Sequence, residues 1–334
     1  MPSAGPGFFH LDERWGLAGS VYSPERAKQM VWLSGLLPYA QAVLVFERIG
    51  RCAIPATSIW RQTQRHGARL KRQQDEHQQH VSLERVVLPP PGLDHKQRKG
   101  VSLDGGKMHI RAEGWKEFKV GAVSDIVMRP ARDPLTHEEV EQAQGVNLAY
   151  TAVLGSTAEF APALWALAVD HHIPQAAEVA VTADGADWIW NLTADYFPGS
   201  VQIVDWYHAG EQLAQAAHAL HPDDEAKAQQ WNTDRREDLY LGAIQAITTP
   251  LDQAGLPSHS QYFHKHQRRM QYQDFREQGY PIGSGTVESG IKQFKVRLSG
   301  PGMRWSRPAA EQMLVIRAAV LTGNFDHLWS TAPN

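Results

Sequence analysis

Three acidic residues stand where apolar segments give way to glycines or to the start of a helix. Asp104 follows the apolar residues VSL and precedes two glycines, Asp184 ends EVAVTAD, and Glu288 lies one turn into the helix expected to open at GSGTVES. Three convergent carboxylates suit Mg²⁺ or Mn²⁺, because both ions prefer hard oxygen ligands. Two such ions support phosphoryl transfer, since one activates the attacking water or 3′-hydroxyl and the other stabilises the departing oxygen. The hypothesis is a two-metal site held by these three acids.

Each acid also has an ordinary structural explanation. An Asp-Gly pair after a strand is more often a hairpin turn than a metal ligand, which applies to Asp104. Asp184 directly precedes an expected helix and would serve as its cap. A glutamate near a helix start, such as Glu288, interacts favourably with the helix dipole. The joint occurrence at two strand ends and one helix start is more specific than any single position.

A second pair, Asp205 and His208 in VDWYHAG, lies at the end of the expected fifth strand. Their spacing places both near one face of a helix start. With no further His or Cys nearby, the favoured role is support beside the site rather than direct ligation. Whether Asp184 or Asp205 is the second metal ligand stays open, and strand order favours Asp184. Four other histidines on polar segments are expected to be solvated: His171, His172, His264 and His266.

The elements that would position these acids follow from a change in periodicity after residue 100. Three successive strands are expected before alternating helices and strands, and Ser156 or Thr157 is expected to cap the first of those helices. This order is typical of an α/β RNase H-like fold, with a mixed sheet and helices on both faces. The expected strands are 101–110, 115–128, 146–155, 178–184 and 201–208, and the helices between the last three are 156–173 and 185–197.

The segments outside this core indicate additional units. Residues 23–79 have helical periodicity, and two short helices around the break RCAIP, the second one basic, are typical of a helix-turn-helix or of a plain helical hairpin. The stretch VVLPPPGLDHKQRKG has the prolines and charges of an exposed linker. The predicted division is a leader at 1–22, a helical DNA-binding region with its linker at 23–98, the first part of the core at 99–208, a helical insertion at 209–279 and the closing part of the core at 280–334.

Composition limits the class of protein. A chain of 334 residues with 42% hydrophobic content is long enough to bury a substantial core. Its single cysteine, Cys52, excludes a disulfide framework or a Cys-rich zinc finger within this polypeptide. The first residues do not have the pattern of a signal peptide. The most apolar window, 148–169, is interrupted by Glu159 and Pro162, so no bilayer span is expected. A cytoplasmic protein without a membrane partner is predicted.

Charge is distributed unevenly. The net charge of -3 argues mildly against a phosphate-rich partner, because nucleic-acid affinity comes from neutralising phosphates. Basic residues nevertheless gather in two segments, and local basic faces on a near-neutral protein are compatible with DNA binding. The alternative is a solvated helix face and a core tryptophan. The candidate DNA-contacting residues are Arg61, Arg65, Arg69, Lys292, Lys295, Arg297, Arg304 and Trp305.

Three motifs carry a family resemblance: TADGADWIWNLTADYFPG, VQIVDWYHA and GSGTVESGIKQFKVRLSGPGMRW. From about Phe8 onward, the chain resembles insertion-sequence transposases of the ISKra type, which are distantly similar to Mutator-like transposases. The resemblance implies that Asp104, Asp184 and Glu288 are the catalytic acids and metal ligands. It also implies that Asp205 and His208 form an auxiliary D-x-x-H motif.

The same resemblance implies a reaction and partners. Metal-dependent hydrolysis at transposon ends would be followed by attack of the freed 3′-hydroxyl on target DNA, with a homo-oligomer expected on the DNA. Related proteins commonly begin with a cysteine-rich zinc-binding segment, which Cys52 alone does not replace, so a truncated, split or shorter transposase is expected. The alternatives are an RNase H-like nuclease without strand transfer, a transposase-derived DNA-binding protein without catalysis, and a defective copy.

Overall fold

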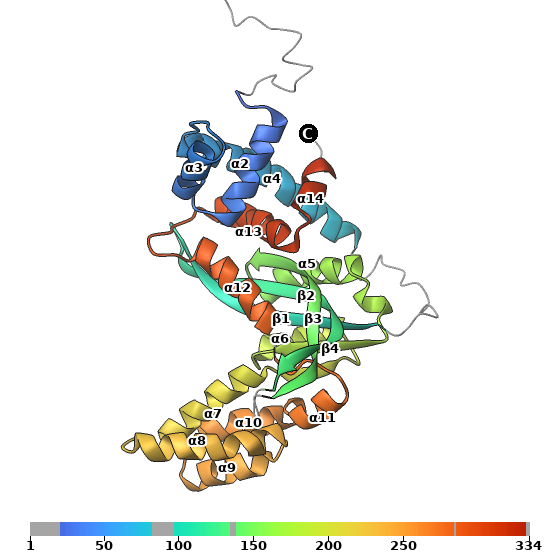
Figure 1. Cartoon of the computed structure of the whole chain (residues 1–334), viewed down its shortest axis with the longest axis vertical. Coiled ribbons are helices and arrows are strands. Elements are labelled where there is room, and N and C mark those ends of the chain that lie inside the picture. Colours follow the sequence, from blue (N-terminus) through green and yellow to red (C-terminus); the bar gives the residue numbers. More distant parts are fainter. Residues whose placement is uncertain (1–20, 82–96, 134–137, 284, 332–334) are drawn as a thin grey trace, which may run out of the picture. The chain divides into compact units, whose positions relative to one another are not determined.

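The computed structural model describes residues 21–81, 97–133, 138–283 and 285–331, except for the side chains of 285–288, and Figure 1 traces their helices and strands. Most of the predicted leader and of the predicted linker lies outside the described residues. The chain divides into two compact units. We call Met1–His77, Lys107–Lys116 and Phe294–Asn334 the helical unit, and Gln78–Gly106 and Glu117–Gln293 the sheet unit.

A five-stranded mixed sheet organises the sheet unit, with the strand order β3-β2-β1-β4-β5. The three-residue turn 111–113 joins β1 to β2, β2 and β3 pair antiparallel, and β4 runs parallel to both β1 and β5. The mixed α/β class predicted from the strand and helix order is therefore confirmed. The strands are β1 (Arg98–Ile110), β2 (Gly114–Arg132), β3 (Glu139–Leu154), β4 (Glu178–Ala183) and β5 (Val201–Val204).

Helices cover both faces of this sheet. On one face, β2 approaches α5 (Thr157–Asp170) so closely that a Cβ on Gly121 would lie 2.6 Å from the Leu164 side chain. On the other face, β3 approaches α12 (Gly285–Leu298), because a Cβ on Gly290 would lie 2.4 Å from the Tyr150 ring. Gly121 pairs with Thr151, the neighbour of Tyr150, and successive strand residues point to opposite faces. The expected two-sided covering is confirmed.

Local sequence sets the start of α5. Ser156 precedes the helix, its side chain accepts the Glu159 backbone N–H, and the Glu159 carboxylate accepts the Ser156 backbone N–H. This capping box satisfies backbone donors that the first helical turn would otherwise leave unpaired. The sequence expectation of a cap at Ser156 is confirmed. The buried face of α5 then presents Phe160 and Leu164 to the core of the sheet unit.

The residues between β5 and α12 are largely helical, as predicted for 209–279. Figure 1 shows α7, α8, α9 and α10 gathered into one helical group. Their apolar side chains, including Leu213, Leu239 and Phe263, continue the core cluster that contains Val181 and Ile203 of the sheet. The remaining helices of the sheet unit are α6 (Asp187–Tyr196), α7 (Trp206–Leu220), α8 (Glu225–Tyr240), α9 (Ile244–Gln253), α10 (Pro257–His266) and α11 (Tyr272–Glu277).

The helical unit joins segments from both ends of the described chain. A Cβ on Gly35 would lie 2.9 Å from Ile316, and one on Gly67 would lie 3.0 Å from Gln312, so α13 packs closely against α2 and α4. The closing segment forms two helices, because Gly323 adopts a left-handed conformation (φ 79°) that ends α13. The unit contains α2 (Pro24–Leu36), α3 (Tyr39–Arg48), α4 (Ala56–His80), α13 (Arg307–Thr322) and α14 (Phe325–Thr331).

Two helical glycines provide a matched test of α12 packing. Gly290→Ala should lower the free energy of unfolding by about 1–3 kcal/mol, because the added methyl overlaps the buried Tyr150 ring. Gly210→Ala in α7 is the control, since its Cβ would meet no atom within 4 Å and alanine favours helices by up to about 1 kcal/mol. Urea unfolding measures both. Equal stabilisation by the two substitutions would contradict the close approach of α12 to β3.

Candidate active site

Three aspartates follow the last paired residues of three adjacent parallel strands. In the β1–β4 pair the final register is Leu103 with Ala183, and in the β4–β5 pair it is Ala183 with Val204. The next residues in sequence are Asp104, Asp184 and Asp205. The Asp205 backbone N–H donates to the Ala183 carbonyl at 2.8 Å, which extends the β4–β5 pairing by one bond. Parallel pairing therefore brings three carboxylate-bearing positions together beyond the carboxyl ends of β4 and β5. We call Asp104, Asp184 and Asp205 the carboxylate edge.

Asp104 lies inside β1, in agreement with the expected strand 101–110 but contrary to its expected position at a strand end. The strand continues to Ile110, and no turn forms at Gly105 or Gly106. A Cβ on Gly106 would lie 2.3 Å from the Phe118 ring, so this glycine makes room for a side chain of β2. Alternation along β1 places Asp104 on the same face as Gly106 and Phe118.

That face is the one covered by α12. Phe118 pairs with Leu154, and Ala122 pairs with Tyr150, so all four residues share one face of the β2–β3 pair. Tyr150 is the residue against which Gly290 of α12 packs. Asp104 and the helix that bears Glu288 therefore lie on the same face of the sheet. The two acids furthest apart in sequence are brought to one side by strand alternation and register.

Asp184 forms a local turn and is not the cap of the following helix. Its Oδ1 accepts the Ala186 backbone N–H at 2.9 Å, whereas the residue preceding α6 is Ala186, which makes no side-chain cap bond. The Tyr262 hydroxyl donates to the Asp184 carbonyl oxygen at 3.3 Å. Gly185 adopts φ 101°, and a Cβ there would lie 3.1 Å from the Tyr262 ring. The half-buried Asp184 is thus held by its own turn and by α10.

Asp205 is the helix cap. It is buried, and its Oδ1 accepts the His208 backbone N–H at 2.8 Å at the start of α7. The His208 ring is partly exposed, and its Nδ1 lies 3.6 Å from a carboxylate oxygen of Glu211. The D-x-x-H spacing therefore matches a helix cap at the start of α7, in which the side chain of the first residue accepts the backbone N–H of the fourth. A helix-capping function explains the pair without assigning it to a metal.

Glu288 is described only by its backbone, as the fourth residue of α12. The segment that leads into α12 is tied to the start of α7, because the Trp206 N–H donates to the Ile282 carbonyl at 2.8 Å. A Cβ on Gly283 would lie 2.9 Å from the Tyr207 ring. Among described side chains, which exclude that of Glu288, no three His, Cys, Asp or Glu residues form a metal-holding group.

Two residues that the sequence reasoning missed lie beside Asp184. His266, expected to be solvated, is 2% exposed, so that prediction is wrong. Its ring lies 5.1 Å from the Tyr262 ring between centroids, and its Nε2 would be 3.3 Å from a Cβ on Gly185. The i,i+4 spacing of Tyr262 and His266, which places both on one face of a helix, is the signal that was available.

Burial and nearby charges shift both groups. Burial, with the cations of Arg269 and Lys265, lowers the pKa of His266 to about 4. Burial, with the negative charges of Asp184 and Asp205, raises the pKa of Tyr262. Near neutral pH both side chains are uncharged, so Tyr262 keeps the proton that it donates to the Asp184 carbonyl. The side chains of Tyr262 and His266 therefore add no charge beside Asp184.

The basic residues expected on α4 have different environments. Arg61 and Arg65 are exposed, as expected for contact with an external partner. Arg69 instead donates to the Trp329 carbonyl at 3.1 Å, and its guanidinium lies 4.7 Å from the centre of the Trp329 ring. Arg69 therefore attaches α14 to α4 within the helical unit.

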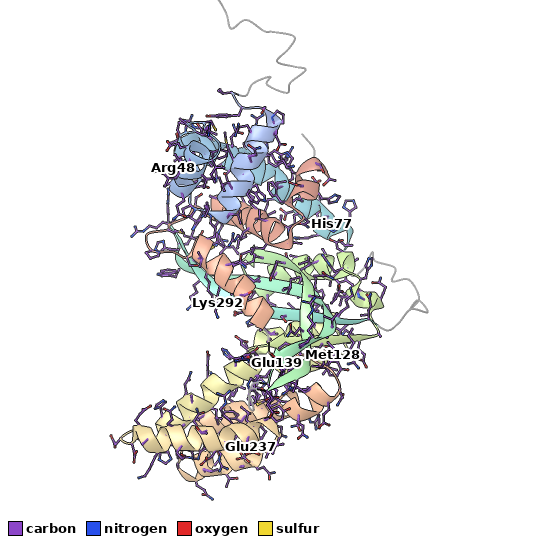
Figure 2. All side chains as sticks on the ribbon, in the orientation of Figure 1. Arg48, His77, Met128, Glu139, Glu237 and Lys292 are labelled. Carbon is purple, nitrogen blue, oxygen red and sulfur yellow. The ribbon has the colours of Figure 1, made fainter. Side chains whose placement is uncertain are left out.

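The second basic segment is also divided by burial. Lys292 and Lys295 are exposed on α12, and Figure 2 shows Lys292 projecting from that helix. Arg297 does not share their exposure, because it is only 2% exposed. Arg304 is exposed, whereas Trp305 is 7% exposed and donates its indole N–H to the Leu298 carbonyl at 2.9 Å. Helical spacing alone did not separate these environments.

Comparison with known proteins supplies no identification. No family model and no curated protein matches the chain. Among the described residues, no helix combines the length and apolar character needed to cross a membrane.

Two substitutions of Asp205 distinguish the contribution of the helix cap to stability from that of the negative charge. Asp205→Ala should lower the free energy of unfolding by about 1 kcal/mol, because α7 loses the acceptor for the His208 N–H. Asp205→Asn should preserve most of that stability, since asparagine is an equally good cap. Urea denaturation of both variants tests the assignment. A matched loss in the Asn variant would show that the charge, not the cap, stabilises this position.

Buried His266 should make the sheet unit sensitive to acid. Because its folded pKa of about 4 is below the ordinary value of 6.5, the unfolded state binds the proton first, and stability falls as the pH decreases from 6.5 to 4. His266→Gln should reduce the difference in unfolding free energy between pH 7 and pH 5. His259→Gln, at a partly exposed position on the same helix, is the control and should leave it unchanged. Identical pH profiles for all three proteins would exclude this role of His266.

Proposed function

We propose that this protein is a DNA transposase of the RNase H-like, three-carboxylate type. The observation that carries the proposal is the register that makes Asp104 and Asp184 the next residues after the last pair of β1 and β4. The strand order β3-β2-β1-β4-β5, with a meander followed by parallel strands, supports the RNase H-like assignment. The packing of α12 on the face that carries Asp104 supports Glu288 as the third acid.

The donor chemistry fits divalent cations. Asp104 and Asp184 are half-buried carboxylates on adjacent strands, and Mg²⁺ or Mn²⁺ is commonly bound by a few carboxylates together with water and phosphate. Asp104, Asp184 and Glu288 would hold these ions. When bound, such a metal pair lowers the pKa of a nucleophilic water or hydroxyl and stabilises the departing oxygen.

The chain's own residues hold the acids and limit their motion. The Ala186 N–H and the Tyr262 hydroxyl fix the turn that presents Asp184. The buried Asp205 begins α7 directly beside it and is proposed to support the site. No serine or cysteine nucleophile is required, since the attacking group would be water for cleavage and a DNA 3′-hydroxyl for strand transfer.

DNA is the proposed partner, with a homo-oligomer assembled on it. The exposed cations Arg61, Arg65, Lys292, Lys295 and Arg304 would contact phosphates, which position DNA without reading its sequence. Arg69 is assigned to the α4–α14 contact instead. The proposed transposase function therefore rests on the acids, and the exposed basic residues are proposed to bind the DNA substrate.

Removing each acid's charge tests the proposed chemistry. Asp104→Asn, Asp184→Asn and Glu288→Gln should each abolish Mg²⁺-dependent cleavage of DNA that carries the element's ends, while duplex binding stays within about twofold, because no phosphate-contacting cation is altered. Asp205→Asn should reduce cleavage without abolishing it. Full activity in any of the first three variants would remove that residue from the site. Complete loss of both cleavage and metal binding in Asp205→Asn would make Asp205 the second ligand in place of Asp184.

The same assay should score joining as well as cutting. A transposase yields covalent joining of the cleaved 3′ end to a target duplex, whereas an RNase H-like nuclease yields cleavage alone. Cutting that depends on Asp104 but never leads to joining would favour the nuclease. Binding of element ends without any metal-dependent cleavage would favour a non-catalytic DNA-binding protein or a defective copy.

A further inference from the structure

A basic and aromatic cavity lies within the helical unit and shares no residue with the carboxylate site. It has a volume of about 360 Å³, within the range of about 300–1,000 Å³ typical of small-ligand sites. Ten described residues line it, and no carboxylate is among them. Three arginines and three aromatic residues dominate the lining: Arg111, Arg297, Arg304, Tyr39, Trp60 and Trp305.

Arg297 is the unusual member of this lining. It is only 2% exposed, and its Nε donates to the Ser34 carbonyl at 2.7 Å. Its guanidinium carbon lies 5.4 Å from the centre of the Tyr39 ring and 5.1 Å from that of Trp305. Tyr39 is the one side chain that interacts favourably with its charge, and no carboxylate among the described residues pairs with it. A buried guanidinium without a carboxylate partner, beside a cavity, is suited to an anionic ligand, because an unpaired buried charge is costly.

Backbone hydrogen bonds fix the two segments that bear the other arginines, Arg111 and Arg304. The Trp305 N–H donates to the His109 carbonyl at 2.9 Å, and the Arg111 N–H donates to the Trp305 carbonyl at 2.8 Å. These bonds fix the backbone of Arg111 and that of Arg304, the neighbour of Trp305. Both arginine side chains are exposed. The cavity therefore combines a buried cation with two accessible ones, which suits an oxyanion such as phosphate.

The aromatic side chains have distinct roles. Trp305 is buried and hydrogen-bonded through its indole, so it forms a wall. Trp60 is 47% exposed on α4, and Arg61 follows it as an exposed residue. An exposed indole beside several arginines is suited to stacking on a nucleic-acid base, since stacking accepts any base. Ordinary duplex DNA keeps its bases stacked on one another, so an unpaired base is required.

We infer that this cavity binds one unpaired nucleotide of a DNA strand, with the base against Trp60 and the phosphate facing Arg111, Arg297 and Arg304. The choice of DNA rests on the proposed function, whereas the nucleotide chemistry rests on the cavity. The cavity would give the protein an affinity for single-stranded or frayed DNA that does not require the carboxylate edge or a metal ion.

The inference is tested by fluorescence anisotropy with the full chain, EDTA, and a labelled single-stranded oligodeoxynucleotide or the matching duplex. Trp60→Ala should weaken single-strand binding about tenfold or more, because it removes one stacking surface. Arg304→Gln should weaken it severalfold and lower the salt dependence by about one phosphate contact. Trp32→Ala and Arg48→Ala, at exposed positions outside the cavity, should change it less than twofold. Duplex affinity should change less than single-strand affinity in the Trp60 variant.

Two results would overturn the inference: unchanged single-strand affinity in both cavity variants, or equal losses for single strand and duplex in the Trp60 variant. If a free deoxynucleoside monophosphate competed as tightly as the oligonucleotide, the assignment to a DNA strand would be wrong. Circular dichroism of each variant confirms folding. The binding assay contains no metal, so its result does not depend on whether the carboxylates support cleavage. Unchanged single-strand binding in the cavity variants would likewise not affect the result of the cleavage assay.

Discussion

Parallel pairing of β1, β4 and β5 is the constraint on which the candidate active site depends. The pairs Leu103 with Ala183 and Ala183 with Val204 fix three chain directions, so the following aspartates reach one edge of the sheet together. Loss of that register by one residue would move each side chain to the other face. The cores on both sides of the sheet therefore protect the arrangement of the acids as well as the fold.

Around this edge, each aspartate has a different local role. Asp104 sits within a continuous strand, Asp184 forms a turn supported by α10, and Asp205 begins α7. Asp184 and Asp205 each accept one backbone N–H through Oδ1, but Asp205 is only 2% exposed, whereas Asp184 is half-buried and more accessible to an ion. This physical difference supports Asp184 over Asp205 in the proposed metal site, in agreement with strand order.

The helical unit adds a second kind of chemistry. Its cavity gathers cations and aromatic rings from α4, the β1–β2 turn and the segment before α13. These segments are far apart in sequence. They meet because α13 packs closely on α2 and α4 through Gly35 and Gly67, and because Trp305 exchanges backbone hydrogen bonds with His109 and Arg111. We therefore propose that the carboxylates of the sheet unit carry out metal-dependent cleavage and that the cavity of the helical unit binds an unpaired nucleotide.

Sequence by itself determined the mixed α/β class, the cap at Ser156, the helices at both ends and the candidate acids, because periodicity, capping and turn chemistry act over a few residues. Tertiary structure alone decided that no turn forms after Asp104, where Phe118 fills the space above Gly106. It also decided that His266 is buried beside Gly185 and that Arg297 is enclosed by Tyr39 and Trp305. Such environments depend on side chains that arrive from distant segments, and local spacing contains no information about those partners.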